Sequence, residues 1–395
     1  MYSLLKLVVV FIFIYICPLE LLLVSSIYFI FKFKKNIKIL TILFFAISYN
    51  LPFFAFGYLD IYFSFFDELF TLSRFLEVLK IHTIFFVVLF WFIDKKISLP
   101  KFLHNKPKLY YFSVVILLLL ILAPVENTIL NSSSYDEVKT SRVFIPIEYG
   151  VGFFFFITTY LKKNKYFVNL LAVLFCLKYL SLGMRVAVVE VLLIFILTSN
   201  NNKFNLKKLL SLGFITIIVM NLFAILRSGR NEINWLFVLL DLNVANAGEV
   251  LYSSIRILGI SDLGFLSFWD KLVSFFYLTF GFLFPGISAS SLSNLSGYMR
   301  DQYPAGGGGL VSVYFFVMIG YLGVTLVPIL IAKTFNKINL SNKKLTLYIS
   351  ILFFMFPRWY SYYPTQLFKF PLYFLIFYLL FQSKNSKNET IKTVS

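Results

Sequence analysis

The chain has 395 residues, of which 59% are hydrophobic and only 14% are charged, and its formal net charge is +18. Such a composition cannot supply the polar surface of a water-soluble fold, and its apolar runs approach the roughly 20 residues that cross a bilayer. The lysines lie in short runs between apolar segments, so the positive charge indicates membrane topology and not a nucleic-acid partner. We therefore expect an all-α polytopic membrane protein with one integral membrane domain over residues 1–395.

Apolar segments follow one another along the chain, and polar stretches separate them. Pro18 interrupts the first segment, which is long enough for a kinked helix or a helical pair. The expected spans cover residues 4–31, 37–56, 75–92, 110–124, 143–161, 166–182, 185–198, 209–226, 310–332, 345–356 and 370–381. They make about eleven transmembrane helices (roughly ten to twelve). The positive-inside rule places the lysine runs and the C-terminus in the cytoplasm.

Residues 227–309 form the longest interval without a convincing span, and we expect a large loop there on the outer face of the membrane. Within it, residues 275–285 are apolar but too short to cross, so they predict a short re-entrant or interfacial helix. In this predicted topology, only two acidic residues, Asp94 and Glu389, fall in inner loops, and no arginine does. The positive-inside rule would not separate arginine from lysine, so we interpret the outer arginines as functional.

Arginine offers a planar guanidinium that matches phosphate oxygens bidentately and keeps its charge at physiological pH. Arginines at the expected outer face therefore suit a lipid-linked diphosphate, and the set comprises Arg74, Arg142, Arg185, Arg227, Arg230, Arg256, Arg300 and Arg358. The alternative for each is an ion pair with a carboxylate or a lipid headgroup. Candidate general bases on the same side are Glu148, Glu232, Glu249, Asp262 and Asp301.

Arg185 follows Gly183 at the start of an expected span, in a tight pair of helices around the turn SLGMR. Lys178 and Glu190 flank it in apolar sequence, and ionisable residues at membrane depth usually indicate function. The alternative is a Lys178–Glu190 or Arg185–Glu190 pair that ties the two helices together.

The glycine run 306–309 directly precedes the span that begins near Leu310. Glycines let backbone N–H groups approach an oxyanion, and a helix N-terminus favours negative charge, whereas the alternative is a flexible hinge. No P-loop lysine follows, so nucleotide binding is not implied. The aromatic run 359–363 either stacks on sugar rings or forms an interfacial belt, which explains it more simply. The two histidines, His82 at an outer span end and His104, lie outside residues 227–309, so histidine catalysis and a metal site are not predicted there.

Three stretches resemble bacterial O-antigen polymerases, also called Wzy-type oligosaccharide repeat unit polymerases. They are GMRVAVVEVLLIFIL from Gly183, LRSGR from Leu226, and GGGGLVSVYFFVMIGYLGVTLVP from Gly306, in which Gly320 and Gly323 form a G-x-x-G. In that family a Gly/Ser-Arg pair begins a span at the periplasmic face. A large periplasmic loop late in the chain is followed by a glycine-rich start of a helix that carries G-x-x-G.

This resemblance implies a glycosyltransferase of the bacterial cytoplasmic (inner) membrane that needs neither a metal, a nucleotide sugar nor another cofactor. It would polymerise undecaprenyl-diphosphate-linked oligosaccharide repeat units into O-antigen or capsule at the outer face. Its catalytic residues would be Arg185, Arg227, Arg230, Arg256, Glu232 and Asp301. Its diphosphate- or glycan-binding residues would be Arg142, Arg300, Tyr303, Gly306, Gly307 and Arg358. Its partners would be these lipid-linked substrates, membrane lipid, and a chain-length regulator and a flippase of the same pathway.

Three alternatives stay open, and one of them, a non-catalytic membrane scaffold, leaves the separation of arginine from lysine without a cause. An O-antigen ligase shares the span pattern, but ligases of that family carry a histidine in the late outer loop, and residues 227–309 contain none. A lipid-linked oligosaccharide flippase usually has two similar halves and short outer loops, whereas this sequence shows no internal repeat and a long, arginine-rich outer segment.

Overall fold

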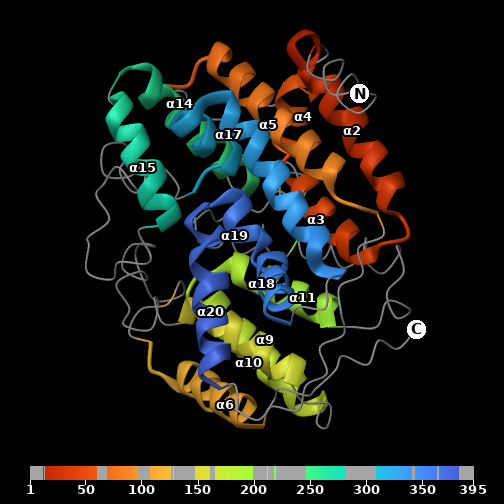
Figure 1. Cartoon of the computed structure of the whole chain (residues 1–395), viewed down its shortest axis with the longest axis vertical. Coiled ribbons are helices and arrows are strands. Elements are labelled where there is room, and N and C mark those ends of the chain that lie inside the picture. Colours follow the sequence, from red (N-terminus) through yellow and green to blue (C-terminus); the bar gives the residue numbers. More distant parts are fainter. Residues whose placement is uncertain are drawn as a thin grey trace, which may run out of the picture. The chain divides into compact units, whose positions relative to one another are not determined.

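The structure is a computed structural model that describes residues 12, 14–59, 69–95, 107–125, 128, 147–160, 165–198, 211, 218, 246–264, 266–280, 308–339, 343–362 and 364–381. Every regular element among these residues is a helix (Figure 1), which confirms the all-α prediction. By contact the chain divides into two compact units, and each is described by itself.

The first unit contains α2 (Pro18–Phe33), α3 (Ile37–Ser48), α4 (Leu51–Leu59), α5 (Leu72–Phe92), α14 (Asn246–Asp262), α15 (Phe268–Phe280), α17 (Val311–Asn336), nearly all of α19 (Phe356–Ser361), and η5 (Pro364–Leu367). The second contains α6 (Pro107–Leu122), α9 (Gly150–Tyr160), α10 (Lys165–Ser181), α11 (Arg185–Thr198), η4 (Lys337–Asn339), α18 (Lys343–Phe354) and α20 (Lys369–Leu380).

Two helices of the first unit, α5 and α17, are long and apolar enough to cross a membrane, and α3 with α4 adds a third span if the bent pair is counted as one. Shorter apolar helices cover Pro107–Leu122, Gly150–Thr159, Tyr166–Ser181, Lys344–Phe354 and Pro364–Leu380. The described residues thus support a membrane protein, while the total of about eleven spans stays a prediction.

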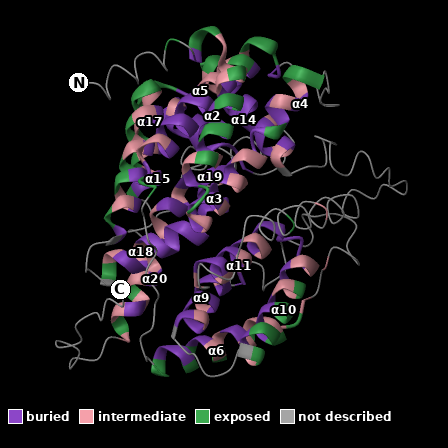
Figure 2. Ribbon diagram, turned by 90° about the vertical axis from the view of Figure 1, so that its right-hand side faces the viewer, coloured by how far each residue is buried: buried purple, intermediate pink, exposed green. Residues whose placement is uncertain are grey.

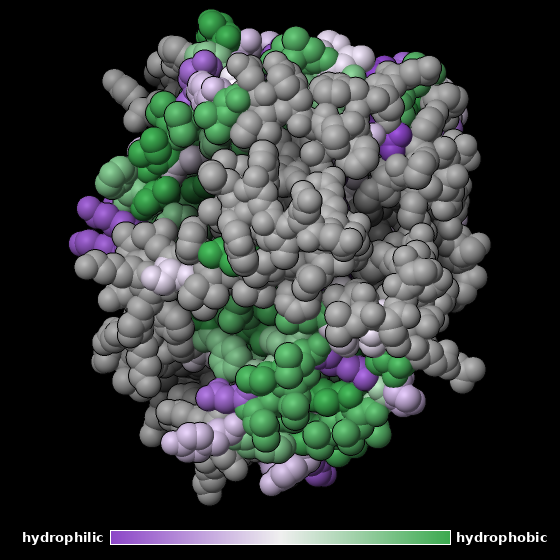
Figure 3. All heavy atoms as spheres, turned by 180° about the vertical axis from the view of Figure 1, so that it is seen from behind, coloured by the Kyte–Doolittle hydropathy of each residue, from purple (hydrophilic) through white to green (hydrophobic). Residues whose placement is uncertain are grey.

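Exposed apolar side chains recur every three or four residues along single helix faces, as expected of helices that face lipid. On α17 they are Leu322, Leu326 and Leu330, and on α10 they are Leu170, Val173, Leu174 and Leu177. Figure 3 shows apolar side chains gathered on one face of the second unit. Large exposed apolar areas of this kind are unusual for a soluble monomer.

Two breaks shape the N-terminal helices. Cys17 lies outside the helical conformation (φ −141°, ψ 69°) and α2 begins at Pro18, so the predicted interruption is confirmed. The span expected at residues 37–56 corresponds to two helices, α3 and α4, which are bent by 43° and are together apolar enough to cross as one broken span. Pro52, the second residue of α4, has no N–H to continue the α3 hydrogen-bond ladder, and Asn50 lies in the break.

The helices α5 and α17 pack in parallel along their length (Figure 1). Near one end the Tyr321 hydroxyl donates to Glu77 Oε1 over 2.8 Å. At the other, Asn336 Nδ2 donates to the Phe92 carbonyl over 2.8 Å and Asn336 Oδ1 accepts from the Asp94 N–H over 2.8 Å. Directly before Tyr321, α17 is kinked at Gly320, whose φ of 64° and ψ of −152° are open to glycine and strained for other residues.

The last carbonyls of α5 are capped by a lysine from α2. Lys32 Nζ donates to the carbonyl oxygens of Phe90, Trp91 and Ile93 over 2.8, 2.8 and 2.9 Å. Asn336 takes the carbonyl of Phe92, so four consecutive carbonyls at this helix end have side-chain donors. Because buried carbonyls without donors are costly, this cap ties α2, α5 and α17 together.

The segment expected to hold a short helix at residues 275–285 instead forms α15 over Phe268–Phe280, seven residues earlier. The reason is a capping box. The N–H and hydroxyl of Ser267 donate to Asp270 Oδ2, and the Asp270 N–H donates to Ser267 Oγ. These hydrogen bonds hold the pKa of Asp270 below its usual value. The sequence analysis followed the apolar run and missed this capping box. Residues 281–285 lie outside the described part of the chain.

In the second unit, α11 packs against α9, α10 and α18, and α18 packs against α20. The predicted tight pair of α10 and α11 is confirmed. Its turn is a Schellman motif, in which the Met184 N–H donates to the Tyr179 carbonyl and the Gly183 N–H donates to the Leu180 carbonyl. Gly183 has a φ of 71°, which an L side chain rarely adopts.

We predict that Lys32→Met lowers the free energy of unfolding by about 1–3 kcal/mol, because three carbonyls lose their donor. Lys32→Arg should recover part of this loss. The matched control is Lys35→Met, which changes an exposed lysine of the same run. The midpoint of thermal unfolding of the purified protein in detergent measures the effect. Equal midpoints for Lys32→Met and Lys35→Met would contradict the cap.

Candidate functional site

Three of the predicted site residues lie in the described part of the chain. Arg256 on α14 and Arg358 on α19 belong to the first unit, and Arg185 on α11 belongs to the second. The others lie outside the described residues: Arg142, Arg227, Arg230, Glu232, Arg300, Asp301, Tyr303, Gly306 and Gly307. The candidate site is therefore built from α14, the start of α17, and α19.

The segment read as an outer loop contains a helix that the sequence analysis missed. This helix, α14, packs against α4, α5 and α17, and its residues Leu251, Ile255 and Leu258 are buried. The signal was present, since apolar residues recur at helical spacing through LYSSIRILGI. The serines and the arginine in that stretch made it look like an exposed loop.

Arg256 is buried within α14. Its guanidinium carbon lies 4.9 Å from the centroid of the Tyr252 ring, one helical turn earlier, and Tyr252 in turn stacks on Phe70 at 6.1 Å. A cation over an aromatic face is stabilised by the ring quadrupole, which offsets part of its desolvation cost. The structure thus holds a positive charge in a low-dielectric environment on a helix that adjoins the glycine run.

The start of α17 is held between α14 and α19. The Leu310 N–H donates to Ser254 Oγ over 2.8 Å, and the Gly309 N–H donates to the Ser361 carbonyl over 3.2 Å. These two backbone donors are therefore already used by the protein. Gly306 and Gly307, the glycines predicted from the sequence to bind an anion, lie outside the described residues.

Two glycines permit this close approach. Gly308 has a φ of 117°, and a Cβ there would lie 2.8 Å from Tyr362 Cδ1 and 3.1 Å from the Ser361 carbonyl oxygen. At Gly309 a Cβ would lie 2.6 Å from Ile257 Cδ1, the flexible end of a side chain. The run is thus packed tightly at these two residues, which disagrees with the flexible hinge considered for it.

Two aromatic residues of α19 are buried and serve neither of the roles considered for them. Trp359 and Tyr360 are fully inaccessible, so neither can stack on a sugar nor form an interfacial belt. Tyr360 lies against His82 and Tyr49, with ring centroids 5.9 and 6.2 Å away. These contacts anchor α19, and Arg358 on the same helix is half-buried.

His82 lies in the middle of α5, not at a span end as expected, and it is buried. Its Nε2 is 2.9 Å from Asn50 Oδ1, and Asn50 Nδ2 donates to Ser26 Oγ over 3.1 Å. The amide oxygen can only accept, so His82 Nε2 carries the hydrogen. Ser26 Oγ donates onward to the Leu22 carbonyl over 2.7 Å. This chain of hydrogen bonds fixes the break between α3 and α4 and gives His82 a structural role.

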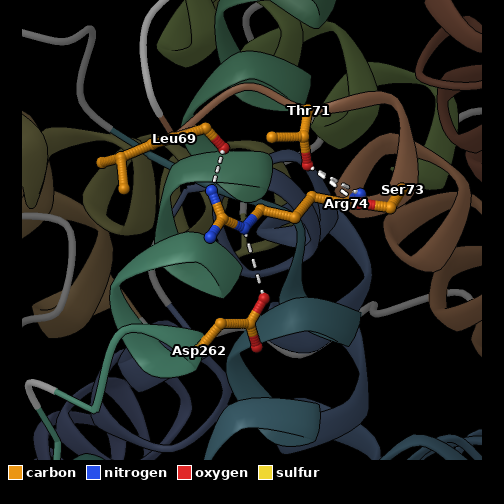
Figure 4. A network of polar contacts seen from close by, with 5 residues as sticks. All are labelled: Leu69, Thr71, Ser73, Arg74 and Asp262. Carbon is orange, nitrogen blue, oxygen red and sulfur yellow. Dashed lines mark hydrogen bonds and ion pairs between the residues drawn. The ribbon is translucent and has the colours of Figure 1, made fainter.

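The ion-pair interpretation applies to Arg74, one of the outer arginines. Its Nε donates to Asp262 Oδ2 over 3.3 Å, and its Nη1 donates to the Leu69 carbonyl over 2.9 Å (Figure 4). Asp262, at the end of α14, was considered as a general base. In the structure it pairs with Arg74 and joins α14 to the start of α5.

In the second unit, Arg185 is the first residue of α11 and is buried. A cation at a helix N-terminus opposes the helix dipole, so helix stability does not explain its position. Glu190, also buried, lies on the same helix. Lys178, considered as a partner for Glu190, donates instead to the Ala123 carbonyl.

In the first unit, the described arginines of the predicted site are Arg256 on α14 and Arg358 on α19, the two helices that hold the start of α17. Within the described ranges no group of three or more His, Cys, Asp or Glu residues is placed to bind a metal. No family model matches the chain, and neither a curated protein nor a solved structure matches it.

We predict different outcomes for alanine at the two glycines. Gly309→Ala should be partly rescued by Ile257→Val, which removes the Cδ1 atom in the way, so the double variant is more stable than the two single effects added together. Gly308→Ala should cost about 1–2 kcal/mol because of its positive φ, and Ile257→Val should not rescue it. Unfolding midpoints of the three single variants and the two double variants test this, and equal rescue of both glycines would contradict the geometry.

Proposed function

We propose that this protein is a repeat-unit polysaccharide polymerase of the bacterial inner membrane. It would join undecaprenyl-diphosphate-linked oligosaccharides at the outer face, with about eleven spans and residues 227–309 on the outer side. The resemblance of the GMR, LRSGR and glycine-rich stretches supports this proposal. So does the parallel packing of α5 and α17, because both helices run from the outer to the inner side in the predicted topology.

The observation that carries the proposal is the position of Arg256. Arg256 lies buried in the middle of α14, over Tyr252, on the helix whose Ser254 holds the start of α17. A guanidinium in such surroundings suits a diphosphate, because desolvation strengthens its attraction to developing negative charge.

In the proposed reaction, a terminal hydroxyl of the incoming repeat unit attacks the anomeric carbon of the growing glycan. The new glycosidic bond forms as the bond from that carbon to the diphosphate oxygen breaks, and the diphosphate leaves with the bonding electrons. An outer carboxylate, Glu232 or Asp301, takes the hydroxyl proton. Arginines stabilise the leaving diphosphate, and undecaprenyl diphosphate is released while the chain grows on the incoming carrier.

The proposal predicts that Arg256→Ala and Arg185→Ala each shorten the glycan, because a preorganised donor aimed at developing charge contributes about 10²–10³ in rate. Arg256→Lys should restore little if the contact is bidentate. Lys271→Ala, which removes another cation between residues 227 and 309, is the matched control. Glycan length on a gel, at equal protein level, is the measurement. Wild-type glycan length in both arginine variants would refute the proposal that these arginines stabilise the leaving diphosphate.

A further inference from the structure

Two charged and two phenolic side chains meet on an exposed side of α5 and α17. Glu77 and Lys80 lie one helical turn apart on α5, and Tyr321 comes from α17. Tyr15 belongs to the helical residues before the break at Cys17. The Tyr321 hydroxyl donates to Glu77 Oε1 over 2.8 Å, and the two tyrosine rings are 6.5 Å apart. The Lys80 ammonium lies 5.5 Å from the centroid of the Tyr15 ring. Three segments of the chain thus build one polar cluster.

This cluster opens toward the surface that the exposed leucines of α17 indicate to be lipid-facing. Tyr15 and Tyr321 are 56% and 39% exposed, and Leu322 beside them is 66% exposed. Figure 2 shows exposed residues along α17. The two charged members are half-buried and belong to a helix long and apolar enough to cross a membrane. Ionisable groups at such a position are costly, which indicates a functional role.

The two opposite charges are held apart. Glu77 and Lys80, both in the described part of the chain, form no ion pair with each other, although side chains three residues apart on a helix are neighbours. The Tyr321 hydroxyl holds the carboxylate instead, and the ammonium lies over Tyr15. Separating opposite charges in apolar surroundings is unfavourable unless each finds a partner. The cluster therefore suits a ligand that carries one negative and one positive group.

The backbone of α17 fixes the turn that carries Tyr321. A Cβ at Gly320, directly before it, would meet no atom within 4 Å, so packing does not require glycine there. The backbone conformation requires it, because the φ of 64° is strained for other residues. Three residues later, a Cβ at Gly323 would overlap the carbonyl oxygen of Phe315. Two glycines are thus used to hold a kink at the cluster, and strained backbone of this kind often marks a functional site.

The depth of the cluster matches a lipid headgroup. With 21 residues, α5 is about 31 Å long, close to the roughly 30 Å of a hydrocarbon core. Glu77 and Lys80 lie about 8 and 12 Å along the axis from its first residue. Side chains of a helix lean toward its N-terminus, so both reach back toward the membrane surface at the start of α5. A lipid in the leaflet at that surface can contact both.

We propose that this cluster binds the zwitterionic headgroup of a phosphatidylethanolamine. Lys80 contacts the phosphate, Glu77 accepts hydrogen bonds from the primary ammonium, and the acyl chains lie along the exposed leucines of α17. The short ethylene spacer between phosphate and ammonium matches the one-turn separation of the two side chains. A polyanionic ligand such as a lipid diphosphate fits less well, because the carboxylate repels it. This inference does not depend on the polymerase proposal.

Native mass spectrometry of the purified protein tests the proposal. The protein in detergent is equilibrated with equal amounts of phosphatidylethanolamine, phosphatidylcholine and phosphatidylglycerol with the same acyl chains, and the retained lipids are identified by mass. We expect the ethanolamine lipid to be retained preferentially. The quaternary ammonium of the choline lipid cannot donate to Glu77, and the glycerol lipid has no cation. Preferential retention of the glycerol lipid, or equal retention of all three, would overturn the proposal.

Charge variants test which groups cause the preference. Glu77→Gln keeps an acceptor for Tyr321 but removes the charge, so it should lower the preference for the ethanolamine over the glycerol lipid by about threefold to tenfold. Glu20→Gln, which changes an exposed carboxylate of α2, is the matched control. Combining Glu77→Lys with Lys80→Glu reverses both charges and should restore the preference that either single reversal abolishes. An unchanged preference in Glu77→Gln would contradict the proposal.

A further variant tests the separation of the charges. Tyr321→Phe leaves both charges but frees Glu77 to pair with Lys80, so it should lose the preference as Glu77→Gln does. The ethanolamine lipid should raise the unfolding midpoint of the wild type above its value in the choline lipid, and should not do so for Tyr321→Phe. Equal stabilisation of both proteins would contradict the proposal. A dimer in the native spectrum that Glu77→Gln dissociates would show that a second copy covers the cluster, and would overturn lipid binding.

Discussion

Main-chain carbonyls at the ends of apolar helices need donors, and in this protein cationic side chains provide them. The clearest case is the end of α5, where Lys32 reaches three carbonyls and Asn336 a fourth. A chain with few charged residues thus uses several of them to finish helices, since unpaired carbonyls in apolar surroundings are costly and an ammonium group can donate to several of them at once. The parallel α5–α17 pair, on which α14 and α15 are built, depends on this cap.

The described arginines differ in their surroundings. Arg74 pairs with Asp262 and donates to the Leu69 carbonyl, so it joins α14 to the start of α5. Arg185 begins a helix, where its charge opposes the dipole, and Arg256 lies buried in mid-helix over Tyr252. The proposed function gives these two arginines a role in stabilising the leaving diphosphate.

Local signals in the sequence predicted local structure well. Pro18 marked a break, and Gly183 marked the turn that Met184 and Leu180 close. The features that the sequence analysis missed depended on tertiary contacts or on polar helix-capping residues within apolar stretches of the sequence. Ser254 of α14 is buried and its hydroxyl accepts from the Leu310 N–H, the Ser267–Asp270 capping box starts α15 early, and α19 buries Tyr360 against His82. Of the candidate site, the position of Arg185 at the start of a helix was foreseen, whereas the burial of Arg256 within α14 was not.

The central claim is that the chain polymerises lipid-linked repeat units, and deletion of its gene tests this most directly. The surface glycan of the deletion strain is separated on a gel. We expect the ladder to collapse to a single repeat unit on the core or lipid carrier. Polymer of normal length left on undecaprenyl diphosphate would indicate a ligase, and complete loss of glycan with repeat units trapped on the inner leaflet would indicate a flippase. Either result would contradict the polymerase account.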